Sequence, residues 1–126
     1  DGIKDILKIC DKYPSLYCHI VSGNCDAIDN FPFLKEVELC GKNFYLTHGH
    51  PECVKSSFAT LAGRAITHGA DIALCGHTHI RAMERFGDII ILNPGSAYEG
   101  NYATLDISEN TGDIKYDFKN IKEYIY

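Results

Sequence analysis

The sequence Ile72-Ala73-Leu74-Cys75-Gly76-His77-Thr78-His79 joins a short apolar run directly to a glycine and two histidines. A continuous apolar run of this length is typical of a central strand that is covered on both faces. In open α/β sheets, ligands bind beyond the carboxyl ends of the strands. The stretch therefore predicts a strand over residues 71–75 that carries His77 and His79 to a functional edge of the sheet.

Three further stretches repeat the arrangement of an apolar run followed by a glycine-containing polar loop. These are Ile20-Val21-Ser22 before Gly23-Asn24-Cys25-Asp26, Phe44-Tyr45-Leu46-Thr47 before His48-Gly49-His50, and Ile89-Ile90-Ile91-Leu92 before Asn93-Pro94-Gly95-Ser96. Four of the six histidines thus lie in two loops that each follow a predicted strand. Such clustering indicates a site assembled from distant parts of the chain.

The His-x-His spacing suits metal binding. Residues i and i+2 of an extended segment point to the same side, with Cα atoms roughly 6–7 Å apart. That span allows His77 and His79 to ligate one ion each of a pair about 3.5–4 Å apart. In the other loop, one of His48 and His50 would ligate and the other would contact substrate. Asn24 adds a neutral oxygen donor, and such mixed ligand sets suit Mn²⁺, Zn²⁺ or Fe²⁺.

Plainer interpretations stay open for several of these residues. The histidines could be surface residues of loops, and Asn24 could be a turn residue. Asp26 could orient a histidine or cap a helix or turn. Residues 93–96 bring no strong ligand and could form the floor of a pocket or a plain turn. Cys25 is disfavoured as a nucleophile because no base can be assigned to it.

The remaining pattern predicts one α/β domain over residues 1–126. Helices are expected at residues 5–10 and 54–68, the second ending at Gly69. Strands are expected at residues 16–21, 37–40, 43–47, 71–75, 81–86, 89–92, 102–107 and 113–118. Helices and strands alternate early and strands dominate late, which favours a sheet sandwich with flanking helices.

Composition excludes several classes of protein. The net charge of −5 and the lack of a Lys/Arg run argue against a nucleic-acid-binding surface. No apolar stretch approaches the ~20 residues of a membrane span, and no signal peptide is visible. The six cysteines contain no Cys-x-x-Cys pair and are interpreted as reduced thiols of a cytoplasmic protein. The sequence leaves homo-oligomer formation open.

The four loop motifs, in this order, resemble those of the calcineurin-like metallophosphoesterase superfamily. The resemblance is closest to its small bacterial and archaeal branch, typified by the YfcE and MJ0936 phosphodiesterases, and runs from about Asp1 to Ile107. It implies a β-sandwich flanked by helices with two divalent metals at the sheet ends, Mn²⁺ first, with Zn²⁺, Fe²⁺ or Ni²⁺ as alternatives. By resemblance, Asn24, His48 and His77 would ligate one metal and His79 the other.

The resemblance also implies roles for His50 and Asp1. His50 would be the catalytic residue nearest the substrate phosphate, and Asn24 would also contact the substrate. The Asp-x-His motif that opens family members is absent here, and Asp1 is predicted to be the aspartate that bridges both metals. Because the chain opens on Asp1 and its only methionine is Met83, we expect the first strand and helix to be missing.

The function predicted from these residues is phosphodiester hydrolysis of a small molecule by a hydroxide bridging two divalent metals. Without the upstream ligands, we expect this chain to be incomplete and poorly active. The alternative is a protein-interaction scaffold on the same fold, like the retromer subunit Vps29. An exposed apolar patch away from the strand ends would favour that alternative.

Overall fold

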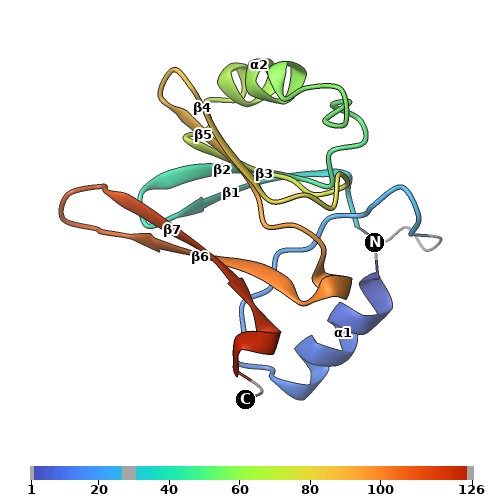
Figure 1. The fold of residues 1–126 in the computed structure, drawn as a ribbon. Coiled ribbons are helices and arrows are strands. Elements are labelled where there is room, and N and C mark those ends of the chain that lie inside the picture. Colours follow the sequence, from blue (N-terminus) through green and yellow to red (C-terminus); the bar gives the residue numbers. More distant parts are fainter. Residues whose placement is uncertain (1, 27–30, 125–126) are drawn as a thin grey trace.

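The computed structural model describes residues 2–26 and 31–124, and shows a mixed α/β fold (Figure 1). The elements, in chain order, are α1 (Ile3–Lys12), β1 (Leu34–Leu39), β2 (Lys42–Thr47), α2 (Ala59–Thr67), β3 (Ile72–Leu74), β4 (Ala82–Phe86), β5 (Ile89–Asn93), the 3₁₀ turn η1 (Ala97–Glu99), β6 (Asn101–Ile107), β7 (Ile114–Asn120) and the 3₁₀ turn η2 (Ile121–Tyr124). The predicted fold class is confirmed.

Five strands form one sheet in the order β1-β2-β3-β5-β4. The three inner strands run parallel, and the outer strands β1 and β4 are antiparallel to their neighbours. The register places Leu46, Leu74 and Leu92 side by side across the inner strands. The carboxyl ends of β2, β3 and β5 therefore lie at the same end of the sheet, and three of the four predicted motif loops begin there.

Helix α2 covers one face of this sheet (Figure 1). Its apolar positions recur with the helical period, and Leu61 and Ala65 are completely buried against Ala73 and Ile91. The predicted end of this helix is confirmed, because Gly69 adopts the left-handed conformation at φ 70°. This packing holds the inner strands and the loops that follow them.

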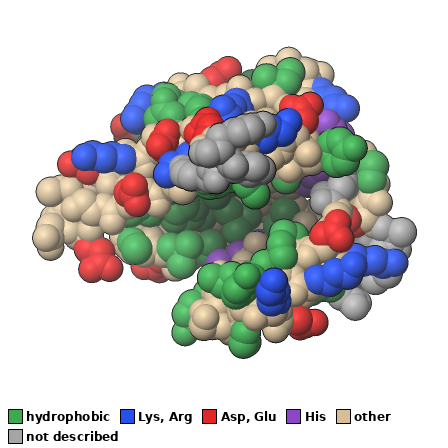
Figure 2. Space-filling view, turned by 60° about the horizontal axis from the view of Figure 1, so that its bottom comes forward, with side chains coloured by type: hydrophobic (Ala, Val, Ile, Leu, Met, Phe, Trp, Pro, Cys, Tyr) green, Lys and Arg blue, Asp and Glu red, His purple; other side chains and the backbone are tan. Residues whose placement is uncertain are grey.

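The opposite face of the sheet looks onto an open groove. Within the described part of the chain, strands β6 and β7 pair only with each other and form a second, two-stranded sheet on that side (Figure 1). Between the two sheets lies a groove of about 930 Å³, and its hydrophobic lining is visible as a hollow in Figure 2. Leu46, Leu74, Tyr102 and Leu105 are among the residues that line it.

The predicted strand at residues 16–21 is wrong. This segment is rich in β-forming residues but runs without regular structure, and Tyr17 is 98% exposed. A strand exists only where a neighbouring strand pairs with its backbone N–H and C=O groups. Among the described residues no strand pairs with this segment, so its β propensity is not realised.

Two predicted boundaries also shift. The second helix begins at Ala59 and not at residue 54, because residues 51–56 form turns and Cys53 has a positive φ of 53°. The first hairpin turns at Cys40-Gly41, one residue earlier than predicted, with φ values of 53° and 75°. Two consecutive positive φ values are typical of the type I′ turns that match the twist of a hairpin.

Membrane spans are absent from the part of the chain that the structure describes, since none of its helices is long and apolar enough to cross a bilayer.

Candidate metal centre

The loop after β2 is shaped by Gly49. This residue has a φ of 112°, and a Cβ atom there would lie 2.6 Å from Cγ2 of Val54. Only glycine therefore fits between the two histidines of this loop. The N–H of Gly49 donates to the hydroxyl of Thr47 at 3.1 Å, which ties the loop back to the end of its strand.

The loop after β3 is fastened to the first loop and to β5. The N–H of Gly76 donates to the carbonyl of His48 at 2.8 Å. The side-chain amide of Asn93, which is fully buried, donates to the carbonyl of Gly76 at 3.0 Å and to the hydroxyl of Thr78 at 2.8 Å. These bonds hold the backbone that carries His77.

Both histidines of this loop have left-handed backbone conformations, with φ of 70° at His77 and 62° at His79. Non-glycine residues seldom adopt this region, and it costs conformational energy. Left-handed residues cluster where tertiary contacts aim a side chain at a site. The predicted extended geometry of the His77-Thr78-His79 segment is therefore replaced by a twisted loop.

Three donor side chains meet at His48. Its Nε2 atom lies 2.9 Å from Oδ1 of Asn24 and 3.1 Å from Nδ1 of His77. Two ligands at right angles around one divalent ion, with bonds of about 2.1 Å, are also about 3 Å apart. His48 thus lies at the spacing of neighbouring metal ligands from both Asn24 and His77. Their nitrogen and amide oxygen donors suit Mn²⁺, Zn²⁺ or Fe²⁺.

His50 borders this cluster. Its ring centroid lies 5.4 Å from that of His48 and 6.1 Å from that of His77. Phe33 packs edge-on against the same ring at 4.8 Å. The Nδ1 atom of His50 is buried and finds no hydrogen-bond partner among the described residues. A buried polar atom of this kind calls for a ligand, an ion or water.

Burial keeps the two central histidines neutral. Burial, together with the neighbouring His77 and His50, lowers the pKa of His48 to about 4. Burial, followed by the charge of Lys55, also lowers the pKa of His77. Neutral imidazole is the form that ligates a metal, so both residues are prepared for that role at neutral pH.

The second predicted metal position is less complete. His79 is exposed, although it lies near enough to contribute to the lowered pKa of His77. Asp1, the predicted bridging ligand, lies outside the described residues. Across residues 2–26 and 31–124, no three His, Cys, Asp or Glu side chains converge on a common metal position. The His–His–Asn cluster is therefore the assembled part of the site.

Asp26 acts as a cap. Its carboxylate accepts hydrogen bonds from the N–H groups of Gly2, Ile3 and Gly23 at 2.8, 3.3 and 2.6 Å. Although burial opposes the change, these backbone bonds lower the pKa of Asp26. The carboxylate therefore fastens the start of α1 to the Asn24 loop.

Two features beside the cluster are not predicted from the sequence. Asn93 lies in the motif for which a plain turn is the alternative interpretation, yet its side chain holds the His77 loop. Glu52 was not singled out, yet it is the only acidic side chain among the buried described residues. Its position four residues after His48 is the one signal that could have drawn attention to it.

Comparison with known proteins agrees with this geometry. Residues 3–110 match the calcineurin-like phosphoesterase superfamily domain. The chain belongs to the calcineurin-like phosphoesterase superfamily. The resemblance inferred from the four loop motifs is thereby confirmed at the level of the family.

Curated relatives include a probable metallophosphoesterase, YsnB, from Bacillus subtilis, which is 31% identical over 86 residues. The match covers 68% of this chain and 51% of YsnB. The phosphodiesterase MJ0936 from Methanocaldococcus jannaschii is 37% identical over 60 residues, 47% of this chain and 32% of that protein. The chain thus spans about half the length, or less, of these relatives.

Among solved structures, Vps29 from Entamoeba histolytica, crystallised with Zn²⁺, superposes with a TM-score of 0.75 at 21% identity. The match covers 93% of this chain and 76% of that one. The two proteins share a fold.

Proposed function

We propose that this chain carries the metal-binding core of a phosphodiesterase that acts on small-molecule substrates. The single observation behind the proposal is the position of the His48 Nε2 atom, 2.9 Å from Asn24 Oδ1 and 3.1 Å from His77 Nδ1. Family membership supports the same reaction class, since relatives are named as probable metallophosphoesterases and as a phosphodiesterase.

In this proposal Asn24, His48 and His77 hold one divalent ion, with Mn²⁺ the first candidate. His79 and Asp1 are the proposed ligands of a second ion. Bound divalent metals supply Lewis acidity toward phosphate oxygens and lower the pKa of a coordinated water. The chain contributes neutral imidazoles, because burial keeps the pKa of both His48 and His77 below the usual value.

His50 is proposed to contact the substrate. Its ring lies beside the cluster, with Phe33 against it at 4.8 Å. The unpartnered Nδ1 atom leaves that nitrogen without a competing bond among the described residues. A histidine in this position can orient a phosphate oxygen or protonate a leaving group.

The test compares wild type with His77→Ala. We expect the variant to lose Mn²⁺ binding in calorimetry and Mn²⁺-dependent hydrolysis of bis(p-nitrophenyl) phosphate, because one of the three converging donors is gone. His19→Ala is the control, since His19 is exposed and outside the cluster. Mn²⁺ binding by His77→Ala at the wild-type level would refute the proposal.

A second candidate, a protein-interaction scaffold, is favoured by the open apolar groove between the sheets. Ile6 of α1, which is 41% exposed, adds apolar surface to the same groove. A scaffold would bind a protein partner through this surface without metal-dependent hydrolysis. The scaffold function would be identified if Leu46→Asp abolished binding of a protein partner and His77→Ala did not.

A further inference from the structure

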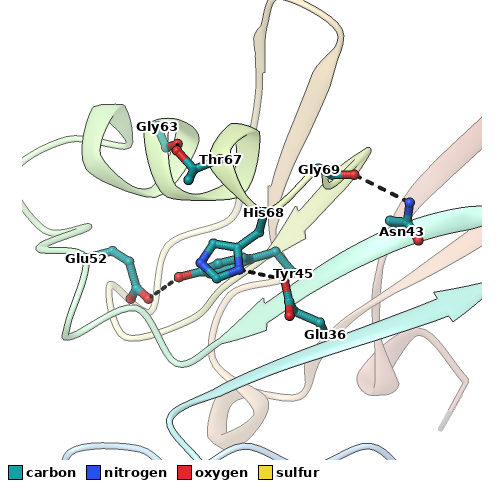
Figure 3. Close-up of polar contacts among 8 residues, drawn as sticks. All are labelled: Glu36, Asn43, Tyr45, Glu52, Gly63, Thr67, His68 and Gly69. Atoms are coloured by element: carbon teal, nitrogen blue, oxygen red, sulfur yellow. Dashed lines mark hydrogen bonds and ion pairs between the residues drawn. The ribbon is translucent and has the colours of Figure 1, made fainter.

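Glu52 is an acidic residue buried beside the candidate metal centre. Its side chain is only 2% exposed, and it lies in the turn that follows His50. One carboxylate oxygen accepts a hydrogen bond from the Tyr45 hydroxyl at 3.1 Å, which Figure 3 shows, and the other accepts from the Thr47 hydroxyl at 2.9 Å. Both partners belong to β2, the strand that leads into His48.

The direction of these hydrogen bonds follows from the chemistry of the groups. The N–H of Gly49 can only donate, and it donates to the Thr47 hydroxyl. Thr47 has one proton, so that proton is directed to Glu52. Burial and the charge of Glu52 raise the pKa of Tyr45 to about 12, which keeps its hydroxyl protonated as the second donor. Glu52 thus ends a relay that starts at Gly49.

This relay bears on both histidines of the loop. Gly49 lies between His48 and His50, and its carbonyl accepts from the N–H groups of Glu52 at 3.2 Å and Val54 at 3.3 Å. The carbonyl of His48 in turn accepts from Gly76. Both the N–H and the carbonyl of Gly49 are therefore hydrogen-bonded. The bond at the N–H is made by the Thr47 side chain, whose hydroxyl is in turn oriented by the Glu52 carboxylate.

We propose that Glu52 is a positioning residue that, through Thr47 and Gly49, orients His48 and His50 at the metal centre. The proposal rests on the proposed function, because it gives those two histidines a ligating and a substrate-binding role. Removing a group that orients a metal ligand typically lowers metal affinity or activity by about 10- to 100-fold. A purely structural carboxylate would affect unfolding alone.

The experiment titrates wild type, Glu52→Ala and Ile89→Ala with Co²⁺, followed by calorimetry and by visible absorption. Ile89 is a matched control: it is a buried core residue at the start of β5, opposite to the end where the loops lie. We expect Glu52→Ala to weaken Co²⁺ affinity by about 10-fold or more and to change the absorption bands. Ile89→Ala should lower the melting temperature but keep affinity and spectrum.

Glu52→Ala with wild-type Co²⁺ affinity and spectrum would overturn the proposal. If this variant does not fold, Thr47→Val and Thr47→Ser take its place. The valine removes the hydroxyl while keeping the shape, and should reproduce the loss of affinity. The serine restores the hydroxyl and should rescue it, so equal affinities for the two would also overturn the proposal.

Failure of the proposed function gives a different result. If wild type and His77→Ala bind Co²⁺ equally weakly, the metal centre itself is refuted. NMR spectra of the histidine rings in the metal-free protein then decide the role of Glu52. Shifted His48 and His50 signals in Glu52→Ala, unchanged in Ile89→Ala, support positioning, and unshifted signals contradict it.

Discussion

The two faces of the five-stranded sheet are built from similarly apolar residues but are covered very differently. On the face under α2, Ala73 and Ile91 are completely buried. On the opposite face, Leu46 and Leu74 line the open groove and are only partly buried, although Phe44 and Leu92, which also line it, are buried. A run of apolar residues therefore indicates that both faces of a strand can be buried. Whether a face is buried depends on another helix or strand that packs against it.

The largest expected effect is on the covered face. We expect Leu61→Ala to reduce the free energy of unfolding by about 3 kcal/mol, because the lost side chain leaves a closed cavity under α2. Urea denaturation followed by circular dichroism measures this change. A loss below about 1 kcal/mol would mean that α2 packs as loosely as the groove does, and would remove the contrast between the faces.

The same truncation on the groove face should cost less. We expect Leu74→Ala to reduce the free energy of unfolding by about 1 kcal/mol, since part of this side chain already meets solvent and no closed cavity forms. The measurement is the same urea series, with Leu61→Ala in parallel. Equal losses in the two variants would show that the groove is filled in solution.

At the end of the sheet where the histidine loops lie, His48 makes the free energy of unfolding depend on pH. Burial lowers the pKa of His48 to about 4, so between pH 4 and about 6.5 the unfolded chain binds more protons than the folded one. His48 therefore makes stability fall as the pH drops through that window. We expect His48→Gln to flatten this part of the curve of metal-free unfolding free energy against pH. If the His48→Gln curve is identical to that of wild type, groups other than His48 take up the protons on unfolding.

The smallest expected effect is a change in the binding of a dye that probes the groove directly. An apolar fluorescent dye such as anilinonaphthalene sulfonate should bind the native protein, because the groove offers an apolar space of about 930 Å³. Leu46→Ser should weaken dye binding, whereas Ile66→Ser, on the exposed side of α2, should not affect the dye. If the native protein does not increase the fluorescence of the dye, the groove is closed in solution.

Much of this fold could be predicted because the signals are local. The apolar run before His77 and the helical period around Leu61 depend only on neighbouring residues, and both elements form. The strand expected at residues 16–21 failed because pairing needs a partner elsewhere in the chain. Similarly, the late start of α2 depends on the positive φ at Cys53, which no periodicity reveals.

The candidate site divides in the same way. The sequence by itself determined which side chains could ligate a metal, and that His48 and His77 follow strands, because strand ends and glycine loops have a local pattern. Only the tertiary structure decided that His48 Nε2 meets Asn24 and His77, and that Glu52 turns inward to Thr47. Packing of the whole sheet brings these residues together. Because hydrogen-bond partners far apart in the sequence have no fixed spacing, the sequence pattern does not reveal which groups will pair.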